Sequence, residues 1–213
     1  MKVLVACEYS GRVRDAFIAK GHEAISCDLL PTDAPGPHYQ GDVFDIVGEG
    51  FDLMIAHPPC TRLANSGARW LKEPPKGRTL VQLWGEFFKA VEFYSRLREA
   101  PIKRKAIENP IMHKHARELL GGIKRQVVQP WHFGDKAFKG TGFELHDLPE
   151  LQDTNRLNPP KPGTEEHKKW SFIHRASPGP DRWKLRSTTF PGIADAMAEQ
   201  WGGDLSNYQK SLI

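Results

Sequence analysis

The stretch Phe51-Asp52-Leu53-Met54-Ile55-Ala56-His57-Pro58-Pro59-Cys60 decides the fold, because an apolar run ends abruptly in a proline-rich tetrapeptide. The run predicts a buried strand over 51–56, and open α/β sheets hold their ligands at the carboxyl ends of such strands. Each proline fixes its own φ and removes a backbone donor, so the loop after the strand is stiff. The sequence therefore predicts that Cys60 is held at the ligand-binding edge of a sheet.

A second predicted strand ends in side chains that suit the same edge. The apolar run over 104–107 is followed by Glu108-Asn109-Pro110. Because the carboxyl ends of parallel strands meet at one edge of a sheet, we expect the carboxyl group of Glu108 and the thiol of Cys60 to lie in one crevice. A nucleophile and a proton donor would then face the same ligand.

Strand and helix patterns alternate through most of the chain. The expected strands cover 2–7, 24–27, 51–56, 104–107 and 125–128, with a short element ending at 41–43; the expected helices cover 10–21, 79–98 and 113–120. This alternation predicts an α/β fold, a doubly wound and mostly parallel Rossmann-like sheet. The apolar stripe of the helix over 79–98 has the spacing of a core-facing surface.

Three regions differ in composition. We expect a catalytic domain over 1–140, a small basic, loop-rich insertion or target-recognition-like region over 141–187, and a closing segment over 188–213 whose helix returns to the catalytic domain. Positive charge gathers late in the chain, at Lys161, Lys168, Lys169, Arg175, Arg182, Lys184 and Arg186. Such a group of cations either follows a phosphate backbone or forms a solvated surface.

Composition restricts the class of protein. The chain has 213 residues, 39% of them hydrophobic and 26% charged, which predicts one main core. No stretch approaches the roughly 20 apolar residues of a membrane span, and residues 1–6 resemble a strand more than a signal peptide. We therefore expect a cytoplasmic protein with no membrane partner. The 3 cysteines lack metal-binding spacing, so reduced thiols and no metal are expected.

Acidic residues at the strand ends indicate the kind of cofactor. The sequence contains neither G-x-G-x-x-G nor G-x-x-x-x-G-K-[ST], which argues against a dinucleotide or a triphosphate. Carboxylates suit S-adenosyl-L-methionine, which has a sulfonium, an amino group and a ribose diol but no phosphate. The predicted cofactor residues run along these strand ends: Glu8, Ser10 and Gly11 near the methionine end, Asp28 with Leu29 at the ribose, Asp42 with Val43 at the adenine, and Pro58. The alternative is that the carboxylates only cap helices and turns.

The order of these motifs resembles that of the cytosine-C5 DNA methyltransferases, in particular the short versions carried by bacteriophages. The likeness rests on 3–11, Ser26-Cys27-Asp28, Gly41-Asp42-Val43, Pro58-Pro59-Cys60 with Ser66-Gly67, and Glu108-Asn109. It implies a class I S-adenosylmethionine-dependent fold, DNA as the partner, either double- or single-stranded, and the host cytoplasm as the location of a phage-encoded member. It also implies base flipping when the DNA is a duplex.

The resemblance assigns roles to several residues. Cys60 would add to carbon 6 of cytosine, and Glu108 would hold a proton at ring nitrogen 3, which requires a carboxyl group whose pKa is raised by a dry pocket. Asn109 would anchor the loop next to the base. The family's Gln-x-Arg-x-Arg motif has no clean match, and Lys136 and Lys139 are the nearest candidates for gripping the substrate. Arg62, in the loop over 61–75, would close over phosphate and base, unless that loop is a mobile surface segment.

Other functions remain open from the sequence. An amino-nitrogen methyltransferase, acting on N4 of cytosine or N6 of adenine, would have an acidic or amide residue, Pro-Pro and an aromatic residue where this chain has His57 to Cys60. A C5-methylase of free pyrimidine nucleotides would use the same chemistry on a smaller substrate. A catalytically silent nucleic-acid-binding module on the same fold would not need the thiol.

Overall fold

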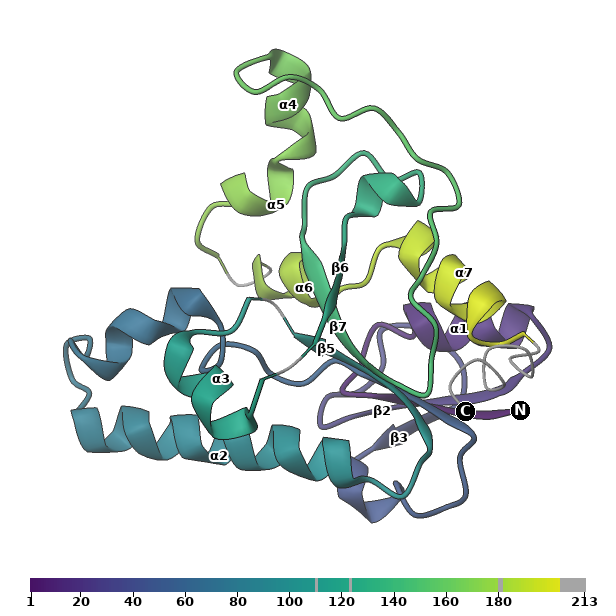
Figure 1. Cartoon of the computed structure of the whole chain (residues 1–213), viewed down its shortest axis with the longest axis horizontal. Coiled ribbons are helices and arrows are strands. Elements are labelled where there is room, and N and C mark those ends of the chain that lie inside the picture. The colour runs from purple at the N-terminus through teal and green to yellow at the C-terminus, as the bar shows by residue number, and fades with distance from the viewer. Residues whose placement is uncertain (110, 123, 180–181, 204–213) are drawn as a thin grey trace.

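The computed structural model describes residues 1–109, 111–122, 124–179 and 182–203. Its centre, in this part of the chain, is a seven-stranded sheet in the order β3-β2-β1-β4-β5-β7-β6 (Figure 1). The strands are β1 (Lys2–Ala6), β2 (Glu23–Asp28), β3 (His38–Gln40), β4 (Leu53–Ala56), β5 (Arg104–Asn109), β6 (Gln126–Val128) and β7 (Thr141–His146). Strands β1 to β5 pair in parallel, and β7 is antiparallel to both β5 and β6. The predicted α/β, mostly parallel fold class is confirmed.

Helices cover both faces of this sheet (Figure 1). The helices are α1 (Arg12–Ala19), α2 (Leu80–Glu99), α3 (Lys114–Leu120), α4 (Glu165–Trp170), α5 (Phe172–Arg175), α6 (Arg182–Ser187) and α7 (Pro191–Gln200), with the 3-10 turns η1 (Val43–Asp45), η2 (Asn65–Leu71) and η3 (Pro130–His132). Because side chains alternate along a strand, Val3 and Val5 of β1 pack with α1 and α7, whereas Leu4 and Ala6 pack with α2 and α3.

The chain changes direction across the sheet between β1 and β4. From β1 it passes outward to β2 and β3, and it then returns to the other side of β1 to form β4 and β5. In open α/β sheets, ligands bind in the crevice outside the carboxyl ends of the strands at such a switch point. Residues 7–10 and 57–60 follow these two strands and therefore lie where a ligand is expected.

A completely buried arginine supports the proline-rich loop between β2 and β3. The guanidinium of Arg14, in α1, donates to Asp15 and Ser26 at 2.7 and 3.1 Å, and to the carbonyl oxygens of Ala34 and Pro35 at 3.2 and 3.0 Å. It lies so close to Gly11 that a Cβ there would be 2.4 Å from Nη2. The side chain of Arg14 therefore fixes the loop between β2 and β3, which lies next to the predicted ribose site.

Three parts of the fold differ from the expectations. Strand β7, over 141–146, was not predicted; it lies inside the sheet, so the sheet continues past residue 140. The short element expected at 41–43 is β3, which ends at Gln40, and η1, which begins at Val43. The loop over 61–75 contains η2, and its Leu63 and Leu71 are buried in the core on the α2 side, so this segment is packed down.

The rest of the region over 141–187 consists, after β7, of long loops and the short helices α4, α5 and α6. In Figure 1, α4 and α5 project away from the sheet, while α6 lies close to it. The closing helix predicted after residue 190 is α7, which packs on α1 through Ile193 and Met197. Residues 204–213 of the predicted closing segment lie outside the described residues. No helix in the described ranges is long and apolar enough to cross a membrane.

Candidate active site

A cavity of about 850 Å³ opens at the carboxyl ends of the strands. Its floor comes from 7–10 after β1, Asp28 at the end of β2, 57–61 after β4, and Glu108 in β5. Its roof comes from the late, basic part of the chain, in particular from α6. The volume lies in the usual range for sites that enclose a small molecule or one nucleotide.

Cys60 and Glu108 line this same cavity. Cys60 follows β4 after two prolines and is exposed, while Glu108 lies near the end of β5 with its side chain 17% exposed. The two groups are near enough that the charge of Glu108 contributes to raising the pKa of the Cys60 thiol. The sequence prediction that β4 and β5 bring a thiol and a carboxyl group to one crevice agrees with this geometry.

His57 holds the Glu108 carboxylate directly. Its Nδ1 lies 2.6 Å from Oε2 of Glu108, and its other ring nitrogen, Nε2, is buried with no hydrogen-bond partner among the described residues. Burial raises the pKa of Glu108, but the hydrogen bond to His57 and the charges of Lys139 and His57 outweigh it, so the pKa lies below its usual value. The expectation of a raised pKa is therefore wrong for the ligand-free protein, because the partner of the carboxyl group was not foreseen.

The thiol of Cys60 is a weak acid in this environment. Although Cys60 is exposed as a residue, the protein atoms around its sulfur withdraw it from water, and this desolvation raises the pKa of the thiol most. The charge of Glu108 raises the pKa further, and a backbone hydrogen bond together with the charges of Lys139 and Arg186 opposes both effects. The other two cysteines are still less acidic: burial is the main cause of the raised pKa of Cys7, and it raises that of Cys27 to about 12. Because a thiolate is the reactive form, Cys60 needs a change in its surroundings to become a nucleophile.

The carboxylate of Glu8 caps a helix. Its oxygens accept from the backbone N–H groups of Val13 and Arg14 at 2.7 and 3.2 Å, and from the hydroxyl of Ser10 at 3.2 Å. Glu8 and Ser10 line the cavity, whereas Gly11, with φ 69°, is the N-cap of α1 and does not line it. The capping alternative thus describes Glu8, whose carboxylate shapes the turn after β1.

The two aspartates predicted to hold the cofactor differ in their positions. Asp28 lines the cavity, and its Oδ1 accepts from the backbone of Leu30 at 3.0 Å. Asp42 is the N-cap of η1, accepts from Phe44 at 3.0 Å, and does not line the cavity; nor do Leu29 and Val43. A role for Asp42 and Val43 at the adenine therefore finds no support from the cavity.

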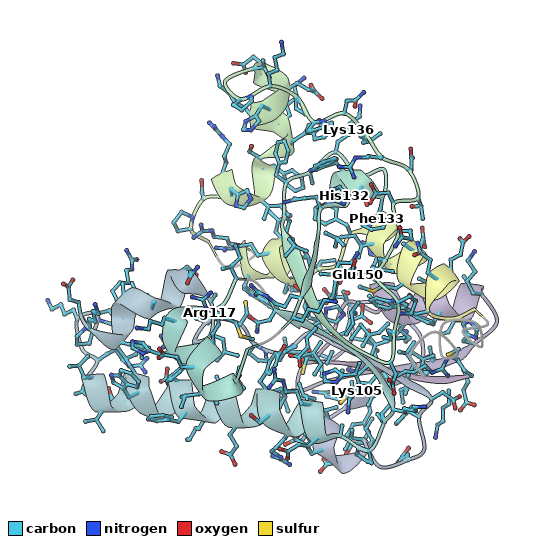
Figure 2. All side chains as sticks on the ribbon, in the orientation of Figure 1. Lys105, Arg117, His132, Phe133, Lys136 and Glu150 are labelled. Carbon is cyan, nitrogen blue, oxygen red and sulfur yellow. The ribbon has the colours of Figure 1, made fainter. Side chains whose placement is uncertain are left out.

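Of the other predicted site residues, some line the cavity and some do not. Pro58 and Lys139 line the cavity, but Arg62 does not, because it forms an ion pair with Glu86 of α2 at 2.6 Å. Lys136 is exposed and lies toward α4, away from the strand ends (Figure 2). Asn109 is 1% exposed and neither of its amide atoms has a partner in the described part of the chain, so no hydrogen bond there supports a loop-anchoring role.

The sequence prediction missed most of the roof. Arg182, Trp183 and Arg186 of the roof line the cavity, and the ring of Trp183 lies 5.2 Å from that of Tyr9 in the floor, which was not predicted either. The signal for the two arginines was the late concentration of positive charge, which does not distinguish a cavity wall from a solvated surface. The contact of His57 with Glu108 was also not predicted, since nothing in the neighbourhood of His57 in the sequence indicates a carboxyl partner from β5.

No family model matches the sequence. No curated protein matches it. Among solved structures, the chain is similar to one described as a DNA modification methyltransferase encoded within a prophage of E. coli, with a TM-score of 0.44 and 16% identity over 75% of this chain and 52% of that one. It is also similar to the methyltransferase EhMeth of Entamoeba histolytica, with a TM-score of 0.45 and 14% identity over 76% and 57% of the two chains. A variant of DNMT2 from Spodoptera frugiperda has a TM-score of 0.36 and 13% identity over 75% and 55%.

This chain spans about half the length of these solved proteins, between 52% and 57% of each.

Proposed function

We propose that this protein transfers a methyl group from S-adenosyl-L-methionine to carbon 5 of cytosine in DNA, through a transient covalent bond to Cys60. One observation carries the proposal: Cys60 and Glu108 line a single cavity at the switch point of the sheet. A thiol beside a carboxyl group suits addition to a ring that must accept a proton at the same time.

The floor of the cavity has suitable groups for the methyl donor. Asp28 uses one carboxylate oxygen for the turn to Leu30, and its other oxygen accepts no hydrogen bond from the described residues, so it can accept from a ribose hydroxyl. The backbone at 7–10, held in shape by Glu8, would lie beside the amino-acid end of the donor. When bound, S-adenosylmethionine would supply an electrophilic methyl group on a sulfonium, and the acidic floor would favour that positive charge.

Cys60 would begin the reaction. Its thiolate forms a bond to carbon 6 of the cytosine, the double bond between carbons 5 and 6 opens, and carbon 5 becomes an enamine-type nucleophile. Once carbon 5 carries the methyl group, loss of its proton to a base and breaking of the bond to sulfur restore the ring and the thiolate. The stiffness of the two prolines before Cys60 would hold the sulfur in one position during both steps.

Glu108 would hold a proton at ring nitrogen 3, and the protons balance when this proton is the one that the Cys60 thiol releases as it becomes a thiolate. In the ligand-free protein its carboxylate is stabilised by His57 and Lys139. A bound cytosine would share a proton with it, and this neutralises one of the charges that raise the pKa of Cys60. Substrate binding would thereby make the thiol more acidic at the moment when the thiolate is needed.

Radiolabelled methyl donor and DNA, followed by nucleoside mass spectrometry, test this proposal. We expect 5-methylcytosine with the unaltered protein and none above background with Cys60→Ser. Cys27→Ala is the matched control, because Cys27 lies in β2 outside the cavity, and it should retain activity if its thermal unfolding is unchanged. DNA containing 5-fluorocytosine should form a stable adduct with Cys60, since the fluorine cannot leave as the proton does. N4-methylcytosine or N6-methyladenine as the product, or full activity of Cys60→Ser, would contradict the mechanism.

A further inference from the structure

Charge in the cavity is divided between floor and roof. The acidic side chains Glu8, Asp28 and Glu108 belong to the strand ends. The cationic side chains that line the same cavity are Lys139, Arg182 and Arg186, from the segment before β7 and from α6. An acidic floor suits a cationic donor, and a basic roof suits an anion.

The roof is attached to the floor at defined points. The hydroxyl group of Tyr9 lies 3.3 Å from the carbonyl oxygen of Lys184 and 3.2 Å from the hydroxyl of Ser187. The ammonium of Lys184 reaches both carboxylate oxygens of Asp33 at 3.1 Å, and Lys139 donates to the carbonyl oxygen of Thr188 at 3.2 Å. These contacts hold α6 over the strand ends with Arg182 and Arg186 facing the cavity.

The late cations are not equivalent. Lys168 and Lys169 pair with Glu165 and Glu166, and Lys184 pairs with Asp33, so these three are neutralised locally. Arg182 and Arg186 have no carboxylate partner in the ranges that the structure describes, and Nε of Arg182 is buried there without a hydrogen bond. A buried guanidinium nitrogen without an acceptor costs free energy, which an anionic ligand would recover.

We propose that Lys139, Arg182 and Arg186 form a subsite for the phosphate group of the nucleotide whose base reaches Cys60. This inference rests on the proposed function for the identity of the base, but the phosphate subsite itself depends only on the roof. Two cations of the subsite, Lys139 and Arg186, line the same cavity as Cys60, and their charges act to lower the pKa of its thiol, so phosphate and base would belong to one nucleotide. Arginine is suited to this role because its planar group donates two parallel hydrogen bonds to phosphate.

The phosphate group can come from a free nucleotide or from a DNA backbone, and two binding measurements distinguish them. In the first, calorimetry compares dCMP with deoxycytidine. In the second, fluorescence anisotropy compares an oligo(dC) strand with the same strand carrying neutral methylphosphonate linkages. Both use the full chain without methyl donor, so the readout does not depend on catalysis, and failure of the proposed methylation leaves it interpretable.

We expect the charged ligand to bind more tightly than its neutral counterpart in at least one of the two measurements. Arg186→Gln should weaken binding of that charged ligand about tenfold, the size of one lost charge-assisted hydrogen bond, and leave the neutral ligand unaffected. For the strand, the slope of log affinity against log salt should also fall by about one. Arg182→Gln should behave similarly.

Arg175→Gln is the matched control, since Arg175 is an exposed cation of α5 outside the cavity. Arg186 is itself exposed, so its substitution should not disturb folding, and circular dichroism checks this. Equal affinity for charged and neutral ligands in both measurements would overturn the proposal. An equal loss in Arg175→Gln and Arg186→Gln would also overturn it, because it would indicate general attraction and no defined subsite.

Discussion

Nδ1 of His57 lies 2.6 Å from Oε2 of Glu108, and this contact joins the loop after β4 to the end of β5. The pair is nearly enclosed, with the His57 side chain 7% exposed and that of Glu108 17% exposed. It keeps Glu108 as a carboxylate in the ligand-free protein. The negative charge of Glu108 raises the pKa of the Cys60 thiol in the same cavity. His57 therefore affects the acidity of Cys60 through Glu108 and does not need to contact the sulfur.

The reactivity of Cys60 should respond in opposite directions to changes in its two charged neighbours. Glu108→Gln removes the negative charge that raises the pKa of the thiol, so alkylation by iodoacetamide at pH 8 should become several-fold faster. Lys139→Gln removes a positive charge that lowers the same pKa, so alkylation should become slower. Both changes can be measured as the rate of alkylation at a series of pH values, by mass spectrometry of the peptide that contains Cys60. Cys27, with a pKa of about 12, is the internal control and should react slowly in all variants.

A change in the same direction for both variants would indicate that access to the cavity, and not charge, controls the thiol.

Removal of the imidazole should destabilise the fold in a pH-dependent way. His57→Asn leaves the buried Glu108 carboxylate without its hydrogen bond to the imidazole, and we expect a loss of about 3 kcal/mol in the free energy of unfolding at pH 7. Because the pKa of Glu108 is depressed in the folded protein, the contribution is complete above the ordinary pKa of about 4.3. It disappears as the pH falls through the folded-state pKa. Urea unfolding at a series of pH values measures this difference.

His115→Asn is the control, because the pair between His115 and Glu118 is exposed, with a distance of 3.7 Å. We expect it to change the free energy of unfolding by less than about 0.5 kcal/mol. If the cost of His57→Asn does not depend on pH, its pairing with an ionised Glu108 is not the source of stability.

The buried arginine of α1 should not tolerate replacement by lysine. Arg14→Lys keeps the charge but cannot reach the acceptors on Asp15, Ser26, Ala34 and Pro35 together. We expect a loss of about 3 kcal/mol in the free energy of unfolding, with faster proteolysis within 30–37 as a local sign. Arg12→Lys, at the exposed start of the same helix, should be nearly neutral. Intact protection of 30–37 in Arg14→Lys would show that the loop has other support.

A second buried network should depend on a tyrosine hydroxyl group. Tyr94 is 0% exposed and donates to Glu144 at 2.8 Å, and burial is the first cause of its raised pKa, followed by the charge of Glu144. Tyr94→Phe should cost about 1 to 2 kcal/mol of unfolding free energy, since it removes one donor from a buried carboxylate. Tyr39→Phe removes a comparable bond to Asp45 at a more exposed site and should cost less. Equal losses in chemical denaturation would contradict the importance of burial.

Most of the sheet could be predicted from local sequence because its strands carry continuous apolar runs. The apolar runs over 3–6 and 53–56 favour strands that are buried on both faces, and the stripe of α2 has helical spacing over 20 residues. Strand β7 was missed because half of its six residues, Gly142, Glu144 and His146, are not typical of a buried strand. It is buried through its partners β5 and β6, which a local pattern does not contain.

In the candidate site, too, local sequence and strand order could be used for prediction, whereas contacts between distant segments could not. Cys60 and Glu108 could be predicted to share one crevice because parallel strands place their ends together, and Asp28 and Lys139 also reach it. The partners that determine acidity could not be predicted, because His57 meets Glu108 from across 51 residues of sequence. For the same reason, the sequence could not distinguish Arg182 and Arg186 from Lys168 and Lys184, which the structure shows to be paired with carboxylates.

Strand β7 also determines when the site can be completed during synthesis. It fills the space between β5 and β6, so the sheet stays unfinished until residue 146 has left the ribosome, and α6 emerges later still. Cys60 is therefore synthesised early, and the cavity that it lines is completed late. A nascent chain carries this sulfur uncovered for most of its translation, and the thiol is more acidic during that interval than in the finished site, because burial and the charge of Glu108 raise its pKa only after folding.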